Sequence, residues 1–282
     1  MNTLLVVDIG NTTTKVGAWN GTTVEAVSVT PTRETESLLE SLLLDSPGPR
    51  SLGEGGSTLR PSDSSVAICS VVPQAEAAWL QWCERNGRAP FIVRGDTPTP
   101  LVNRYRAPDR LGPDRLAAAV GAAHRFGAPA IVASLGTAVV VDAVSPSKEF
   151  LGGAIWVGMA AGFATLAERT GLPDLAPPPA ADGRRNLRDL RMIQGPSAPI
   201  GDDTQACLLA GAFHGTAALI DGLAQRMRAY MDGAAPLVLT GGDAEAITFF
   251  LREKHEVVPH LALIGSALIW EHNHGGAVDA NR

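Results

Sequence analysis

An aspartate at the end of a short apolar run, followed by a glycine turn and several hydroxyl side chains, is the part of this sequence best suited to bind phosphate. Asp8 would leave the end of a buried strand, where an unpaired carboxylate is costly unless it meets a cation or hydrogen-bond donors. Gly10 permits a sharp turn whose N–H groups can hold phosphate oxygens, and Asp8 can then hold the Mg²⁺ that accompanies a nucleoside triphosphate. The alternative is an ordinary hairpin in which Asp8 accepts hydrogen bonds from the turn. The segment reads Asp8-Ile9-Gly10-Asn11-Thr12-Thr13-Thr14-Lys15.

Two further turns of glycine and threonine each follow an apolar run, at Gly136-Thr137-Ala138 and at Thr240-Gly241-Gly242. They can grip phosphates from a second wall, or admit a flat group such as adenine close to the backbone. Each is equally compatible with a plain strand-to-helix turn. The sequence contains neither G-x-x-x-x-G-K-[ST] nor G-x-G-x-x-G, so the commoner nucleotide-binding folds have no support.

Gly112-Pro113-Asp114-Arg115 opens a predicted helix. An acidic residue in a first helical turn is favourable through the helix dipole alone, which is the ordinary explanation. The functional explanation makes Asp114 a general base and Arg115 a donor to an anionic or polyhydroxylated substrate. Phosphoryl transfer requires little more than an oriented hydroxyl, a base, a metal ion and donors to the phosphoryl oxygens.

The elements around these motifs predict an α/β fold of two similar domains, at 1–112 and 113–282, with a cleft between them. Each domain opens with hairpin strands and continues into helices, and the run Leu4–Gly10 is similar to Ala130–Thr137. In the second domain a long helix is predicted over Asp202–Tyr230, broken near Gly211 or Gly215, and a shorter one over Ala244–Arg252. The remaining predicted strands are Leu4–Val7, Lys15–Trp19, Val24–Val29, Val66–Val72, Phe91–Val93, Ala130–Ser134, Val139–Val144, Phe150–Trp156, Leu237–Thr240 and Glu256–Val258, and the remaining helices are Thr35–Leu44, Ala75–Asn86, Pro113–Phe126, Gly158–Arg169 and Ala262–Trp270.

The amino-acid composition limits the classes of protein to which this chain can belong. The chain has 23 basic and 29 acidic residues, a net charge of −6, and 45% hydrophobic residues. It can therefore bury a core, and its acidity argues against a general binder of nucleic acid or of anionic membranes. The longest uncharged stretch, Phe150–Ala167, contains four glycines and is better explained as a strand, a turn and a helix start than as a membrane span. Three widely spaced cysteines and no basic leader before Leu4–Val7 favour a soluble cytoplasmic protein.

Taken in order, the motifs resemble those of the type III pantothenate kinases, in the acetate kinase–sugar kinase–Hsc70–actin superfamily. The similarity covers nearly the whole chain. It comprises Asp8–Thr12, Tyr105 with Gly112–Arg115, Leu135–Ala138, Gly152–Ile155 with Gly158, Thr170–Pro173, Ile200–Thr204 with Gly211, and Thr240–Gly242.

The resemblance implies two actin-like (ribonuclease H-like) α/β domains and ATP-dependent phosphorylation of pantothenate, the first step of coenzyme A biosynthesis. It also implies Mg²⁺, a monovalent cation (K⁺ or NH₄⁺) and a homodimer. Asp114 would take the hydroxyl proton, Asp8 would bind Mg²⁺, and Thr204 would contact substrate across the dimer. The residues implied at ATP are Asp8, Ile9, Gly10, Asn11, Thr12, Thr13, Thr14, Lys15 and Thr137, and those at pantothenate are Tyr105, Gly112, Pro113, Asp114, Arg115 and Thr204.

One position departs from the family pattern. The family carries an aspartate for the monovalent cation where this chain has Ser134. A hydroxyl can coordinate potassium but supplies no negative charge, so another acid compensates, cation dependence is altered, or activity is reduced. Two alternatives therefore stay open: a catalytically weakened homologue acting as a regulatory or interaction protein, and a kinase of the same superfamily for another small hydroxylated acid. Val157 replaces a common proline, and Asp45–Ser65 is expected to be a surface insertion.

Overall fold

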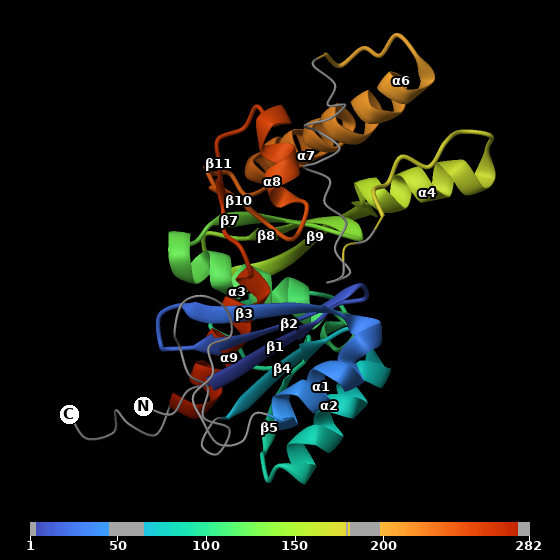
Figure 1. The fold of residues 1–282 in the computed structure, drawn as a ribbon. Helices are drawn as coiled ribbons and strands as arrows, with labels where there is room; N and C mark the ends of the chain where they lie inside the picture. Colours follow the sequence, from blue (N-terminus) through green and yellow to red (C-terminus); the bar gives the residue numbers. More distant parts are fainter. Residues whose placement is uncertain (1–3, 45–64, 179, 181–197, 276–282) are drawn as a thin grey trace. The chain divides into compact units, whose positions relative to one another are not determined.

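The computed structural model describes residues 4–44, 65–178, 180 and 198–275, and they form two compact units (Figure 1). The first unit contains the described residues up to His124 together with those from His260 onward. The second contains the described residues from Arg125 to Pro259. The insertion predicted at Asp45–Ser65 lies outside the described residues except for Ser65, whose carbonyl accepts a hydrogen bond from the Leu5 amide.

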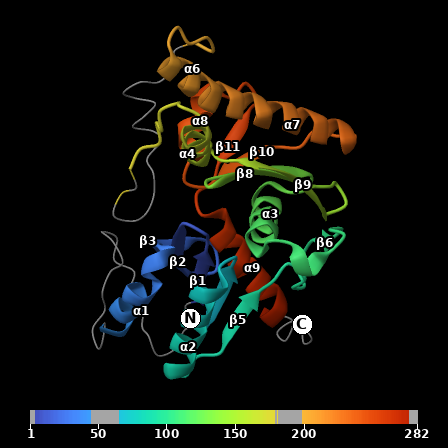
Figure 2. The same cartoon turned by 90° about the vertical axis from the view of Figure 1, so that its right-hand side faces the viewer.

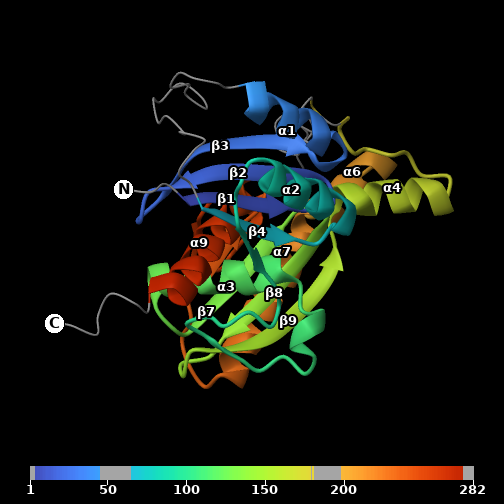
Figure 3. The same ribbon diagram turned by 90° about the horizontal axis from the view of Figure 1, so that it is seen from below.

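The first unit is built on a mixed sheet with the strand order β3-β2-β1-β4-β5. Strands β1 to β3 pair antiparallel, and β4 and β5 add in parallel on the other side of β1. Figure 3 shows helices α1 and α2 on one face of this sheet and α9 on the other. The elements are β1 (Leu4–Ile9), β2 (Thr13–Trp19), β3 (Val24–Pro31), a 3₁₀ turn (Thr32–Glu34), α1 (Thr35–Leu44), β4 (Val66–Ser70), α2 (Pro73–Arg85), β5 (Pro90–Val93), β6 (Val102–Asn103), a 3₁₀ turn (Pro108–Arg110), α3 (Pro113–Phe126) and α9 (Leu261–His274).

Alternation along β1 explains why Asp8 faces away from the main core of this unit. Successive side chains of a strand point to opposite faces. Leu5, Val7 and Ile9 pack with residues of α1 and α2, including the fully buried Trp79. Asp8 therefore points to the face that α9 covers.

Helices α3 and α9 approach each other closely because glycines remove the side chains at their contacts. A Cβ at Gly265 would lie 1.7 Å from the carbonyl oxygen of Ala117, and one at Gly121 would lie 2.9 Å from that of Leu261. Trp19 Nε1 also donates to Glu271 Oε1 at 2.6 Å, which fastens α9 to the sheet. This packing makes α3 and the C-terminal helix part of the first unit, whereas the sequence placed both in a domain spanning 113–282.

The second unit repeats the same topology, since its strands have the order β11-β10-β7-β8-β9. Strands β7 to β9 pair antiparallel, and β10 and β11 add in parallel beside β7. The matching order of elements predicted for the two halves is thus confirmed. The elements are β7 (Ala130–Leu135), β8 (Ala138–Val144), β9 (Glu149–Val157), α4 (Met159–Arg169), α6 (Thr204–Ala210), a π-helical turn (Gly211–Gly215), α7 (Thr216–Tyr230), β10 (Leu237–Thr240), α8 (Ala244–Ile247), a 3₁₀ turn (Thr248–Phe250) and β11 (His255–Val257).

Two predictions for this unit need correction. The helix over Thr204–Tyr230 continues through the glycines as a π-helical turn and does not break there, because an added residue can be absorbed as a π-bulge. The helix predicted over Ala244–Arg252 is α-helical only to Ile247. The uncharged stretch Phe150–Ala167 forms strand β9 and helix α4, as predicted.

One described helix, Thr204–Tyr230, is long and apolar enough to span a membrane by length and composition alone. Its second half buries Ala217, Ile220 and Ala224 in the core of the second unit. That placement is typical of a core helix of a globular protein.

Candidate active site

The turn after β1 is built from the residues that the sequence assigned to ATP. Gly10 donates its N–H to the carbonyl oxygen of Thr13 at 3.0 Å, and a Cβ at Gly10 would lie 3.2 Å from that same oxygen. Thr32, which directly follows β3, stabilises this turn, because its hydroxyl donates to the Gly10 carbonyl at 2.6 Å. Sequence reasoning missed Thr32, because its contact spans twenty-two positions.

Not every residue of this segment can reach a ligand through its side chain. Ile9 is fully buried in the core, and Thr14 is fully buried with its hydroxyl 3.2 Å from that of Thr32. Asn11 and Thr12 are exposed, and Thr13 is half-buried. Ile9 and Thr14 therefore shape the turn, while Asn11 and Thr12 face solvent.

Asp8 and Lys15 form an ion pair at the base of this turn. They stand opposite each other on β1 and β2, and Lys15 Nζ donates to Asp8 Oδ2 at 3.0 Å. Asp8 is only 6% exposed, so its carboxylate needs this cation or another one. The charge of Asp8 raises the pKa of Lys15 although burial opposes it, and the charge of Asp114 acts in the same direction as Asp8.

The Asp114 carboxylate lies at the start of α3. Its Oδ1 accepts the N–H of Arg115 at 2.9 Å, and the same N–H lies 3.1 Å from the carbonyl of Gly112. A Cβ at Gly112 would come within 2.7 Å of Asp114 Oδ1, so glycine at this position leaves room for the carboxylate as it is oriented here. Pro113, at the first helical position, is buried, and its fixed φ suits the start of a helix.

Arg115 and Tyr105 form a second pair beside Asp114. The guanidinium of Arg115 lies over the Tyr105 ring, 5.4 Å from its centroid, and Arg115 Nη1 lies 3.5 Å from the tyrosine hydroxyl. Asn103 orients this loop, since its Oδ1 accepts the Tyr105 N–H and its Nδ2 donates to the Gly95 carbonyl. Sequence reasoning did not identify Asn103.

The side chains of Lys15 and Cys69 are both influenced by Asp8 and Asp114, which places these two carboxylates in one region of the first unit. Lys15 is influenced by both carboxylates. Cys69, opposite Asp8 on β4, has its pKa raised well above the usual value, chiefly by burial and then by the charges of Asp8 and Asp114. Cys69 is completely buried. Two carboxylates and an ammonium group thus lie in one region of the first unit, on the side of the sheet that carries α9.

The second unit carries the glycine turns predicted at 136 and 241. Gly136 donates to the Ala138 carbonyl, and Gly158 donates to that of Thr137 at 3.1 Å. A Cβ at Gly158 would lie 2.0 Å from the carbonyl oxygen of Gly136, and one at Gly241, where φ is +98°, would lie 2.1 Å from that of Leu135. These two glycines are therefore required by the fold.

Gly136 differs from them, because a Cβ there would meet no heavy atom within 4 Å and its φ is not positive. Neither packing nor backbone strain within the described residues requires glycine at this position. Thr137, the next residue, is exposed. A bare and accessible backbone at this turn is suited to close approach by a ligand.

Ser134, the residue expected at the family's cation position, lies near the end of β7 in register with Thr240 on β10. Ala133, Leu135 and Leu239 point into the core, so Ser134 and Thr240 point to the opposite face. The structure thus pairs two hydroxyl side chains where the family pattern expects a carboxylate.

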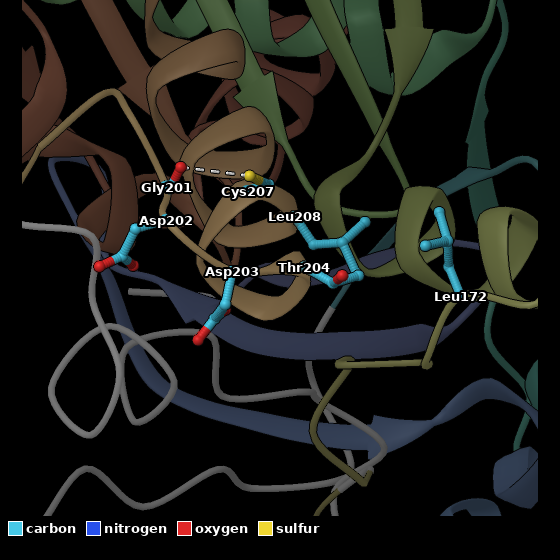
Figure 4. A pocket seen from close by; sticks show the side chains of 7 residues that line it. All are labelled: Leu172, Gly201, Asp202, Asp203, Thr204, Cys207 and Leu208. Carbon is cyan, nitrogen blue, oxygen red and sulfur yellow. Dashed lines mark hydrogen bonds between the residues drawn. The ribbon is translucent and has the colours of Figure 1, made fainter.

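Thr204 begins helix α6 and lines an open cavity of about 440 Å³ (Figure 4). Asp203 caps this helix by accepting the Ala206 N–H at 2.7 Å. Cys207 Sγ donates to the Gly201 carbonyl at 3.4 Å on the cavity wall. The predicted site residues are thus divided: Asp8–Lys15, Tyr105 and Gly112–Arg115 belong to the first unit, and Ser134, Thr137 and Thr204 belong to the second.

Comparison with solved structures concerns the fold. A conserved Baf family protein from Campylobacter jejuni aligns with a TM-score of 0.57 at 18% identity, covering 96% of this chain and all of the other. Component A of (R)-2-hydroxyglutaryl-CoA dehydratase from Acidaminococcus fermentans gives a TM-score of 0.50 at 14% identity, covering 95% and 97%. The expected fold class, two similar actin-like α/β domains, is confirmed.

Sequence comparison identifies the family. The model of the type III pantothenate kinase family matches residues 4–226. A type III pantothenate kinase of Roseiflexus castenholzii is 33% identical over 96% of this chain and 99% of its own length. One from Frankia casuarinae is 32% identical over the same shares. With most of its length matched by the family model and nearly all of it by these relatives, the chain belongs to the type III pantothenate kinase family.

Proposed function

We propose that this protein transfers the γ-phosphoryl group of ATP to the primary hydroxyl of pantothenate, the first step of coenzyme A biosynthesis, in the cytoplasm. The observation that carries the proposal is the convergence of Asp8, Lys15 and Asp114 in the first unit, where Lys15 is influenced by both carboxylates. Such a group supplies a metal-binding acid, a cation and a base, which are the parts that phosphoryl transfer needs.

The ATP phosphates would lie along the Gly10 turn. The exposed Asn11 and Thr12 offer donors there, and the buried Asp8 carboxylate suits Mg²⁺, which is usually bound through one or two carboxylates together with substrate phosphates. Mg²⁺ would neutralise charge that develops on the phosphate oxygens. Lys15 already holds Asp8 at 3.0 Å, so its ammonium group keeps the carboxylate in place.

Pantothenate would lie between Asp114 and the Tyr105–Arg115 pair. Arg115 can hold the carboxylate of this acid with two parallel hydrogen bonds, and its contact with the Tyr105 ring reduces its freedom to turn away. Asp114 would accept the proton of the attacking hydroxyl. Its backbone contacts at the start of α3 fix its orientation before substrate arrives.

The turn of the second unit would contact ATP through Gly136 and Thr137. The open space at Gly136 supports this assignment, since no contact within the described fold explains the glycine. Thr137, which is exposed in this turn, would contact the triphosphate through its hydroxyl. A monovalent cation is expected near Ser134, whose single neutral hydroxyl is a weak site on its own.

A homodimer is supported by apolar side chains that the second unit leaves uncovered. Ile155 and Trp156 on β9 are 59% and 61% exposed, and Leu166 on α4 is also exposed. Exposed apolar patches of this kind are typical of interaction sites. Helices α4 and α6 both project from the same side of this unit (Figures 1 and 2). A second copy seated there would reach the Thr204 cavity.

The experiment that tests the function is an assay of ADP release by the purified full-length protein with ATP, Mg²⁺ and pantothenate at high potassium. The product is identified by mass spectrometry as 4′-phosphopantothenate. A panel of other small hydroxylated acids serves as the control for substrate identity. ADP release that requires pantothenate supports the proposal. No release with pantothenate at any potassium concentration contradicts it.

A further inference from the structure

The described residues of the second unit contain a buried carboxyl group that the proposed reaction does not use. Asp243 follows the Thr240-Gly241-Gly242 turn and is only 9% exposed. Its side chain makes no hydrogen bond or ion pair with any residue that the structure describes, and although Asp243 stands at the N-cap position of α8 its carboxylate does not cap the helix. A buried carboxylate in this state is costly, and proteins resolve the cost by protonation or by binding a cation.

The position of Asp243 is fixed on the end of β7. Its N–H donates to the Leu135 carbonyl at 3.3 Å. The close approach of Gly241 to the same carbonyl presses this turn against β7. Asp243 is thus anchored to the residue that directly follows Ser134.

The surroundings supply further oxygen atoms. Ser134 and Thr240 are neighbours in register on the face opposite the core. Hydroxyl and main-chain carbonyl oxygens suit a large ion of low charge, and one carboxylate balances a single positive charge. Burial raises the pKa of Asp243 to about 6, and a cation bound beside the carboxylate would offset this cost of burial.

We propose that Asp243 supplies the negative charge of a monovalent-cation site in which Ser134 contributes only a hydroxyl. The inference rests on the proposed function, since the monovalent cation enters with it. In this chain the acid of the site comes from the turn after β10 and not from β7. The cation site would therefore keep one negative charge, carried by Asp243, although position 134 is a serine.

Cation binding can be measured without catalysis. The melting temperature of the full-length protein is compared in potassium chloride and in tetramethylammonium chloride at equal ionic strength, and binding of Tl⁺, a potassium analogue, is followed by thallium NMR. Potassium is expected to raise the melting temperature of the wild type. Asp243→Asn should abolish this rise and weaken Tl⁺ binding by about tenfold or more, since a unit charge at contact distance is lost.

Matched variants make the result specific. Glu256→Gln removes an exposed carboxylate of β11 in the same unit and should leave the potassium effect unchanged. Ser134→Asp with Asp243→Asn should restore it, and Ser134→Asp alone should strengthen Tl⁺ binding even if Asp243→Asn does not fold. A potassium effect that persists in Asp243→Asn, or that is absent from the wild type, overturns the inference.

Kinase activity is recorded on the same samples so that the two proposals can fail separately. Potassium binding that depends on Asp243 without pantothenate-dependent ADP release supports the site and contradicts the proposed function. Release of ADP that persists while Tl⁺ binds equally to wild type and Asp243→Asn supports the function and overturns the site.

Discussion

Replacing Lys15 by methionine should destabilise the first unit markedly, because it leaves Asp8 buried without its cation. The side chain of Asp8 is 8% exposed and that of Lys15 is 23% exposed. Breaking a buried ion pair from one side costs about 3–5 kcal/mol. Since Lys15 retains some solvent contact, we expect the lower end, about 3 kcal/mol, in the free energy of unfolding.

The reasoning is tested by a double-mutant cycle. Asp8→Asn removes the charge that needs Lys15, so Asp8→Asn with Lys15→Met should be far more stable than the sum of the single variants predicts. A coupling of about 2 kcal/mol is expected for such a pair in contact. Urea unfolding at neutral pH supplies the free energies by linear extrapolation, and Trp79 and Trp82, both buried in the first unit, supply the fluorescence change.

The outcome that refutes this argument is additivity. If Lys15→Met lowers the free energy of unfolding by less than about 0.5 kcal/mol, the level of an ordinary surface substitution, the pair does not stabilise the site. The same conclusion follows if the costs of the two single variants simply add in the double variant.

Two further substitutions test the second unit. Gly241→Ala should cost about 2 kcal/mol or more, because φ is +98° and its Cβ would lie 2.1 Å from the Leu135 carbonyl oxygen, and positive φ alone costs alanine about 1–2 kcal/mol. Gly242→Ala, whose Cβ would meet nothing within 4 Å, is the control in the same thermal melts, and equal loss in both variants would contradict the geometry. Glu253→Gln should lower the melting temperature at neutral pH but not in acid. Two hydrogen bonds lower the pKa of Glu253, the larger effect coming from Gln225 and the next from Arg228. The ionised Glu253 side chain therefore stabilises the fold above its ordinary pKa, and this contribution is lost as the pH falls through the lowered pKa. The group is partly solvated, and we expect less than about 1 kcal/mol; a difference between variant and wild type that stays constant down to strongly acidic pH would show that the pair does not act through charge.

Local sequence patterns predicted much of the fold, because strand alternation, glycine turns and first-turn residues act over a few positions. The strand at Leu4–Val7, which the structure extends to Ile9, and the helix at Pro113–Phe126 were found in this way, and with them Asp8 and Asp114. The course of helix α9 was not predictable by such means. Its place beside β1 depends on Gly265 meeting Ala117, a contact between residues that no local pattern connects.

The site shows the same division between local and distant causes. Residues that carry chemistry in their own motif, such as Asp8 and Arg115, could be named from the sequence. Those that act by supporting a distant segment could not, because a hydroxyl such as Thr32 or an amide such as Asn103 has no distinctive local pattern. Asp243 was missed for another reason, since only its burial distinguishes it from any other aspartate in a turn.

The account depends most directly on Asp114 as the group that takes the hydroxyl proton. The decisive measurement is kcat for pantothenate-dependent ADP release by Asp114→Asn, alongside its melting temperature and its KM for ATP. Loss of a general base should lower kcat by about a hundredfold or more, with the melting temperature and the KM for ATP close to those of the wild type. An Asp114→Asn protein that is folded and turns over pantothenate at nearly the wild-type rate would contradict the account.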